Sequence, residues 1–160
     1  MAEDTLAAIM TRRLVTADAD SDALTAIQRM VRADIGAVLV RRGKRVVGII
    51  TERDLLRMAA KGKSIVGKPV SAVMPRRKLI TAKPEDPPLR ALELMARHKV
   101  RRIPVARGGN VVGIVTERDV VKWLLRKPEV ILDLLSPEYP AVSRDALVAL
   151  LKEMQVRARV

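Results

Sequence analysis

The order of apolar and polar positions along this chain contains one pattern that occurs twice. An apolar, mostly β-branched run around a glycine covers 46–50, and Thr51–Asp54 (Thr-Glu-Arg-Asp) follows it at once. The second copy covers 111–119. This order predicts a strand that ends where a helix begins. Because the first backbone N–H groups of a helix have no partner within it, we expect ligand chemistry at this junction.

Around these junctions the periodicity predicts two units with the same five elements. The expected strands cover 14–16, 35–40 and 46–50 in the first unit and 79–81, 100–105 and 111–115 in the second. Apolar residues at helical spacing predict one helix between the first two strands and another after the third. A short glycine-containing turn joins the last two strands, which predicts a hairpin. The fold class is therefore α/β (α+β), with two β-α-β-β-α repeats.

The two units are also alike in sequence. Residues 14–54 align with 79–119 without a gap and are identical at nearly half of the positions, so the chain holds two copies of one supersecondary unit. Neither copy can build much core alone, and we expect them to pack on each other about a pseudo-two-fold axis. We divide the chain into a first repeat, a linker, a second repeat and a C-terminal helical tail, at 5–60, 61–69, 70–127 and 128–160. The tail is expected to pack on the repeats or on a second subunit.

Composition excludes several classes of function. The chain has no cysteine, which removes disulfides, thiolate nucleophiles and cysteine metal sites. His98 is the only histidine, so neither a Ser-His-Asp site nor a conventional zinc site can be assembled. The phosphate-binding P-loop and the dinucleotide fingerprint are both missing. We expect a protein that is not an enzyme and requires no metal or cofactor.

Other features of the composition concern location. Apolar residues make up 49% of the chain, but charges interrupt every long apolar run, so we expect no membrane-spanning segment. The first residues include acidic Glu3 and Asp4 where an export signal would be basic and then apolar, which favours a cytoplasmic location. Scarce asparagine and glutamine, together with the missing cysteine, resemble the composition of heat-adapted proteins.

The net charge is +13, and a field of this sign attracts nucleotides, nucleic acid or acidic protein surfaces. Basic residues gather at 41–45, 76–78 and 99–102. Phenylalanine is absent, and the chain has one tryptophan and one tyrosine, so the stacking platforms of single-strand binders are missing. Non-specific contact with a nucleic-acid backbone is therefore an alternative function, less favoured than nucleotide binding.

Gly48–Asp54 and Gly113–Asp119, with Val100–Val105, Met10 and Met74-Pro75, resemble a tandem pair of cystathionine β-synthase (CBS) domains, or Bateman module. The resemblance covers residues 5–127. It implies a regulatory module with clefts between its repeats that bind an adenosine-containing ligand such as AMP, ADP, ATP or S-adenosylmethionine. It further implies a homodimer, and a conformational change that a second subunit or a regulated partner protein detects.

Under this resemblance, Asp54 and Asp119 would accept hydrogen bonds from the ribose hydroxyls, because a carboxylate offers two acceptor oxygens to a cis-diol. Thr51 and Thr116 would lie beside the sugar or phosphate, and the arginines within each motif are candidates for the anionic end. The adenine is expected against a strand segment of small residues. The complete set of candidate ligand-binding residues is Thr16, Gly36, Ala37, Val38, Leu39, Thr51, Arg53, Asp54, Thr81, Arg101, Arg102, Ile103, Pro104, Thr116, Arg118 and Asp119.

The same motif has a structural interpretation. Thr-x-x-Asp at a helix start is also a variant of the capping box, and capping and ligand binding can coexist. The repeats differ where an adenine slot is expected, because Gly36-Ala37 becomes Arg101-Arg102 and Leu39 becomes Pro104. We therefore expect two non-equivalent sites. A dimerisation scaffold without ligand is a further alternative.

Overall fold

The structure, a computed structural model, describes residues 4–135, which form two compact units. One unit, residues 13–79, is called the continuous unit. The other combines residues 4–12 with 80–135 and is called the split unit. Of the helical tail expected at 128–160, only residues 128–135 are among the described residues, and the rest lies outside them. Within 4–135, none of the helices combines the length and the apolar character needed to cross a membrane.

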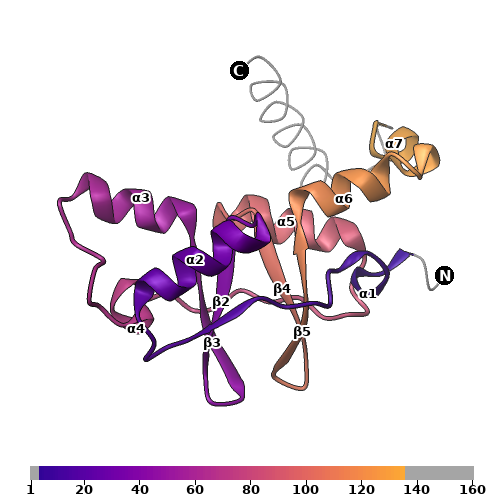
Figure 1. Ribbon diagram of the computed structural model, residues 1–160. Coiled ribbons are helices and arrows are strands. Elements are labelled where there is room, and N and C mark those ends of the chain that lie inside the picture. Colours follow the sequence, from indigo (N-terminus) through magenta and orange to yellow (C-terminus); the bar gives the residue numbers. More distant parts are fainter. Residues whose placement is uncertain (1–3, 136–160) are drawn as a thin grey trace. The chain divides into compact units, whose positions relative to one another are not determined.

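The continuous unit is a three-stranded sheet with helices (Figure 1). The strand order is β1-β2-β3, with β1 parallel to β2 and β2 antiparallel to β3. Its elements are β1 (Thr16–Asp18), α2 (Ala23–Ala33), β2 (Ala37–Arg42), β3 (Arg45–Thr51), α3 (Glu52–Ala60) and α4 (Val70–Val73).

Local chemistry sets the bounds of α2 and of the strand that follows it. The Asp22 side chain caps the helix by accepting a hydrogen bond from the Leu24 N–H at 2.7 Å. The helix ends at Asp34, whose φ of 49° is left-handed. β2 therefore begins only at Ala37, two residues after the expected position. Its first four residues are buried, and two of them, Val38 and Val40, pack in the unit's apolar core with residues of α2 and α4.

The split unit repeats the hairpin and its two flanking helices (Figure 1). Its core includes Leu6 and Met10 from the N-terminal segment, together with Trp123 from near the end of the repeat. Its elements are α1 (Leu6–Ile9), α5 (Pro88–His98), β4 (Arg102–Arg107), β5 (Asn110–Thr116), α6 (Glu117–Leu124) and α7 (Pro128–Leu135).

Each unit takes its short helix from the other repeat of the sequence. In the split unit, α1 is held where the Leu6 N–H donates to the Asp86 carbonyl at 2.8 Å. In the continuous unit, α4 is held where the Val70 N–H donates to the Ser21 carbonyl at 2.9 Å. The repeat boundaries at 60 and 70 thus describe the sequence, whereas the compact units divide the chain after residues 12 and 79.

The first strand of the continuous unit, β1, lies two residues later than the expected 14–16. Backbone hydrogen bonds extend the pairing beyond both ends of the strand. The Leu39 N–H donates to the Val15 carbonyl at 3.1 Å, and the Ala19 N–H donates to the Arg41 carbonyl at 2.8 Å. These outer bonds hold three residues of β1 in register with β2.

The expected strand at 79–81 is wrong, because the split unit has only an isolated parallel bridge between Ala82 and Val105 at this place. Two prolines explain the difference. Pro104 and Pro84 correspond to Leu39 and Ala19, the two residues whose N–H groups make the outer bonds in the continuous unit. Proline has no N–H, so neither bond can form in the split unit. With both outer bonds removed, the strand is reduced to its central bridge.

Candidate functional site

Both Thr-Glu-Arg-Asp motifs lie where a strand passes directly into a helix, as the sequence predicts. β3 ends at Thr51, which is the N-cap of α3, and β5 ends at Thr116, which is the N-cap of α6. Both threonines have an extended backbone, so each side chain turns back toward the free N–H groups of the first helical turn.

Each motif forms a complete capping box. In the continuous unit, Asp54 Oδ2 accepts hydrogen bonds from the Thr51 N–H at 3.0 Å and from its hydroxyl at 2.6 Å. In the split unit, Asp119 Oδ2 accepts the same two bonds from Thr116 at 2.8 and 2.7 Å. Each aspartate N–H donates in return to the threonine Oγ1, at 3.4 and 3.3 Å. The capping interpretation of the motif is therefore confirmed in both repeats.

The capping box uses only one oxygen of each carboxylate. Both hydrogen bonds go to Oδ2, and within residues 4–135 nothing donates to Oδ1 of Asp54 or Asp119. An ionised carboxylate accepts at both oxygens. Asp54 as a whole residue is buried. Among the described residues, every fully buried side-chain oxygen has a hydrogen-bond partner, and Asp54 Oδ1 has none, so this oxygen must be in contact with solvent. The cap thus leaves one charged acceptor open to a ligand at each junction.

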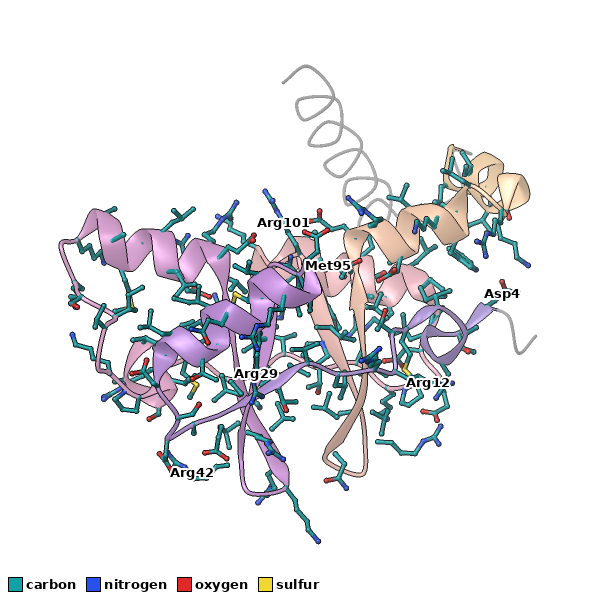
Figure 2. All side chains as sticks on the ribbon, viewed as in Figure 1. Asp4, Arg12, Arg29, Arg42, Met95 and Arg101 are labelled. Carbon is teal, nitrogen blue, oxygen red and sulfur yellow. The ribbon has the colours of Figure 1, made fainter. Side chains whose placement is uncertain are left out.

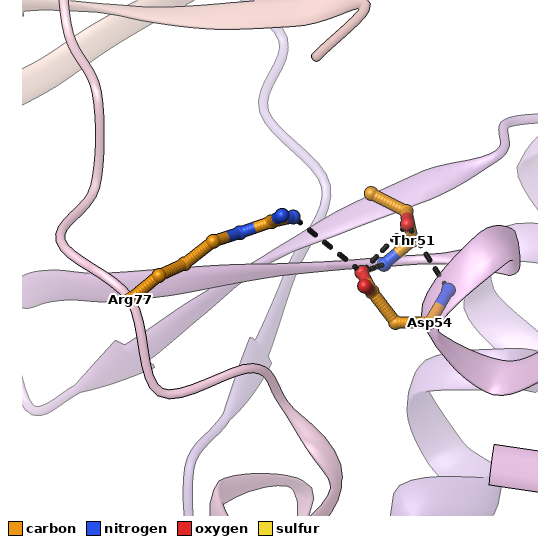
Figure 3. A network of polar contacts seen from close by, with 3 residues as sticks. All are labelled: Thr51, Asp54 and Arg77. Carbon is orange, nitrogen blue, oxygen red and sulfur yellow. Dashed lines mark hydrogen bonds and ion pairs between the residues drawn. The ribbon is translucent and has the colours of Figure 1, made fainter. Parts of the chain in front are cut away.

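Arg77, which is not among the candidates predicted from the sequence, lies beside the Asp54 carboxylate (Figure 3). Arg77 Nη2 is 3.8 Å from Asp54 Oδ2, and the Arg77 side chain is 44% exposed. Across the described residues, Asp119 has no cation within ion-pair distance. The basic run at 76–78 was the only signal in the sequence, and it did not connect this arginine to Asp54.

The segment expected to face the adenine lies next to the motif in the continuous unit. The Gly36 carbonyl accepts a hydrogen bond from the Glu52 N–H at 3.2 Å, which joins the start of β2 to the start of α3. The next three residues of β2, Ala37, Val38 and Leu39, are buried. The structure therefore brings this strand segment and the Thr51–Asp54 junction together.

The split unit has the same connection but different side chains. The Arg101 carbonyl accepts from the Glu117 N–H at 3.2 Å, and Arg101 Nε lies 3.8 Å from Glu117 Oε1. Arg102 is half-buried, while Ile103 and Pro104 are buried in β4. The two junctions therefore differ in charge and bulk at the same position, as the sequence predicts.

Of the remaining candidates, Arg53, Arg118 and Thr81 are exposed and Thr16 is half-buried. Arg53 and Arg118 are exposed, and the described residues include no ion-pair partner for either of them. The Thr16 carbonyl accepts a hydrogen bond from the guanidinium of Arg29 (labelled in Figure 2), a contact that the sequence does not indicate. Thr81 is exposed beside the isolated bridge. These four candidates have no geometry that distinguishes them as ligand contacts.

Comparisons with known proteins agree with this architecture. The CBS domain profile matches twice, at residues 6–61 and 70–126. The mitochondrial CBS domain-containing protein CBSX3 of Arabidopsis thaliana is 36% identical over 113 residues, which are 68% of this chain and 55% of that protein. The chain thus spans about half the length of that curated relative.

Two solved structures of CBS domain proteins are similar in fold. The CBS domain pair of protein MJ0100, in complex with 5′-methylthioadenosine and S-adenosyl-L-methionine, is 25% identical with a TM-score of 0.69, covering 77% of this chain and 97% of that one. A CBS domain protein from Pyrobaculum aerophilum complexed with AMP is 24% identical with a TM-score of 0.69, covering 78% and 98%. With two profile matches and these likenesses, the chain belongs to the CBS domain family.

Proposed function

We propose that this chain is a regulatory module in which Asp54 and Asp119 bind the ribose diol of an adenosine-containing ligand. The single observation that carries the proposal is the use of each capping box. One carboxylate oxygen holds the helix start, and the other accepts nothing from the described residues. This arrangement occurs in both repeats at the same junction. The bound AMP, 5′-methylthioadenosine and S-adenosyl-L-methionine of similar CBS proteins support this class of ligand.

The surroundings of Asp54 fit the two parts of an adenosine. Its Oδ1 offers a charged acceptor to the hydroxyl groups of a cis-diol, and hydrogen bonds to an ionised acceptor are stronger than neutral ones. The adjacent segment from Gly36 to Leu39 supplies small and apolar residues for the flat faces of an adenine. Gly36 has no side chain to separate its backbone from a ligand. The sugar and base therefore have separate, neighbouring contacts in the continuous unit.

Regulation requires that the ligand favours one arrangement of the module over another. We propose that binding changes the relative arrangement of the repeats, and that a second copy of the chain or a separate partner protein detects the change. Light scattering with and without ligand measures the association of chains. A ligand that binds but alters neither association nor the hydrogen-exchange pattern outside its site would contradict this part of the proposal.

Isothermal titration of AMP, ADP, ATP, S-adenosylmethionine and 5′-methylthioadenosine tests the diol contact. Asp54→Asn and Asp119→Asn are the informative variants, because the asparagine carbonyl can still accept from the capping threonine while its NH₂ replaces the free acceptor. Loss of a hydrogen bond to a charged group predicts affinity lower by about tenfold to a hundredfold at the altered site.

Asp22→Asn is the matched control, because Asp22 caps α2 through the Leu24 N–H and both residue types are good N-caps. We expect this variant to bind as the unaltered chain does. Unchanged binding in both Asp54→Asn and Asp119→Asn, with the fold retained, would rule out the diol contact.

One observation favours a second function, contact with a nucleic-acid backbone. The tip of the β2–β3 hairpin carries four exposed cations without an ion pair among the described residues: Arg41, Arg42 (labelled in Figure 2), Lys44 and Arg45. The β4–β5 hairpin differs, because its Arg107 pairs with Glu85 at 2.8 Å. A two-stranded ribbon with basic ends fits the major groove of a duplex. A salt titration of binding tests this second function.

A further inference from the structure

We propose that Arg77 makes the Asp54 site selective for adenosine ligands that carry a phosphate. This inference rests on the proposed function and adds the residue that distinguishes charged from uncharged ligands. The family likeness does not supply it, because Arg77 lies outside the repeated Thr-Glu-Arg-Asp motifs and outside every segment selected from the sequence as a ligand contact. The observation behind it is the position of the Arg77 guanidinium relative to the Asp54 carboxylate.

The guanidinium of Arg77 reaches the carboxylate without being fixed by it (Figure 3). Its Nη2 lies 3.8 Å from Asp54 Oδ2, which is an ion-pair distance longer than a hydrogen bond. In the described part of the chain, no other side-chain contact holds the guanidinium, so all five of its N–H donors are available. The backbone is anchored, since the Arg77 N–H donates to the Pro75 carbonyl at 3.0 Å.

Charge explains why such an arginine matters for a ligand. A carboxylate that binds a ribose diol also repels a phosphate on the same sugar, and this repulsion is strong at short distance where water is partly excluded. The positive charge of Arg77 offsets the charge of Asp54. A guanidinium also matches phosphate geometry with paired N–H donors, and an exposed side chain without hydrogen bonds can turn toward it. An uncharged adenosine gains neither effect.

The second carboxylate provides an internal comparison. Asp119 has the same capping box as Asp54, but no cation among residues 4–135 is paired with it. At that junction, Arg101 Nε lies 3.8 Å from Glu117 Oε1. Among the described residues, an arginine paired with the aspartate of the capping box is thus found only in the continuous unit.

Titration calorimetry in an Asp119→Asn background isolates the Asp54 site, with AMP and 5′-methylthioadenosine as the two probes. Both contain the diol and the adenine, but only AMP has a phosphate. We expect Arg77→Gln to lower the affinity for AMP about tenfold, which is the effect of losing a charged hydrogen bond at a half-exposed site. Binding of 5′-methylthioadenosine is expected to stay within about twofold, because no contact to a phosphate is lost.

Arg76→Gln is the matched control, because it removes the same charge from the neighbouring exposed residue. It should leave the ratio of the two affinities unchanged. Arg77→Lys should keep part of the preference for AMP, since it retains the charge but loses the paired donors. Raising the salt concentration should weaken AMP more than 5′-methylthioadenosine, and Arg77→Gln should remove that difference.

Three results would overturn the inference. Equal weakening of both probes by Arg77→Gln would make Arg77 a structural residue, an unchanged AMP affinity would make it irrelevant, and tighter binding of both probes would make it a competitor of the ligand. In each case 5′-methylthioadenosine binding that depends on Asp54 would leave the proposed function intact. If neither probe binds at the Asp54 site, the proposed function and this inference fail together.

Discussion

Met10 packs on Gly113 so closely that a methyl group added to the glycine would lie 2.3 Å from the methionine Sδ and 2.7 Å from its Cγ. The partner of Gly48 is Met74, whose Sδ and Cε would be 2.8 and 3.3 Å from such a methyl group. Each methionine follows one of the exchanged short helices, α1 or α4. The glycines of β3 and β5 are therefore required by the packing of a segment from the other repeat.

This packing predicts that Gly113→Ala destabilises the chain more than Gly48→Ala. At position 113 the clash includes Cγ, which is near the methionine backbone, so relief requires α1 to move. At position 48 only the flexible end of the side chain is in the way. We expect a loss of about 1–3 kcal/mol in the free energy of unfolding for Gly113→Ala and less than about 1 kcal/mol for Gly48→Ala. Urea denaturation measures both.

A double-mutant cycle provides the control for this prediction. Met10→Ala removes the clashing atoms, so its cost and the cost of Gly113→Ala should be less than additive when the two are combined. Strict additivity would show that Met10 does not cause the effect of the alanine.

A second prediction concerns the capping boxes. Thr51→Ala and Thr116→Ala each remove the side-chain acceptor of the aspartate N–H and one donor to its carboxylate. We expect each variant to lose about 1 kcal/mol of unfolding free energy. Thr→Ser at either position keeps the hydroxyl and should lose less. Stability curves of the four variants decide this, and alanine variants as stable as the serine variants would contradict the capping role.

The sequence was sufficient for the local features of the fold and the site. The strand-to-helix junction and the capping box depend on residues within one or two turns of each other, so Thr51 and Asp54 were correctly associated. The hairpins were predicted for the same reason, because an apolar run on each side of a glycine-containing turn determines the pairing. β2 and β4 each begin two residues later than predicted, because the preceding helix ends in a left-handed residue, Asp34 or Lys99, before the strand can start.

Features that depend on distant residues were not predicted. Nothing local shows that α1 packs with the second repeat, because four residues of helix carry too little pattern. The ion pair between Arg77 and Asp54 joins positions that only the tertiary fold brings together. The strand is missing at 79–81 because Pro84 and Pro104 remove two N–H groups that the corresponding ladder uses. Predicting this requires the register of the parallel pair, which the sequence does not provide.

A third prediction concerns how the fluorescence emission of Trp123, the single tryptophan, depends on pH. The Trp123 indole N–H donates to Asp4 at 3.2 Å, and Lys127 Nζ is 3.1 Å from the same carboxylate. The Lys127 side chain first, and then the indole, stabilise the ionised carboxyl and hold the pKa of Asp4 below its usual value. The pKa of Asp4 is lower in the folded than in the unfolded chain, so these contacts contribute to the stability of the fold. That contribution is complete above the unfolded-state pKa and is lost as pH falls through the folded-state pKa.

We therefore expect Trp123 emission to stay constant as pH falls to the ordinary aspartate range and to change only below it. Asp4→Asn has no titrating group at this place, so its emission should not show that step. Far-UV circular dichroism at each pH separates the local change from acid unfolding. Identical profiles for the two proteins would show that Asp4 does not contact the indole in solution.

The last prediction tests the basic hairpin tip as a contact for duplex DNA. Arg42 lies directly opposite Arg45 in the β2–β3 register, and like charges in that position are unfavourable by about 0.2–1 kcal/mol. Each cation that neutralises a phosphate contributes about 0.9 to the slope of log affinity against log salt concentration. Lys44→Gln/Arg45→Gln should therefore lower the slope by about 2 and slightly stabilise the fold, whereas Lys61→Gln/Lys63→Gln removes two exposed charges elsewhere and should leave the slope nearly unchanged. Fluorescence anisotropy across a salt series measures the slopes. Equal slopes for the two double variants would mean that the hairpin is an ordinary solvated surface, and its opposed arginines would then have no binding role to offset their repulsion.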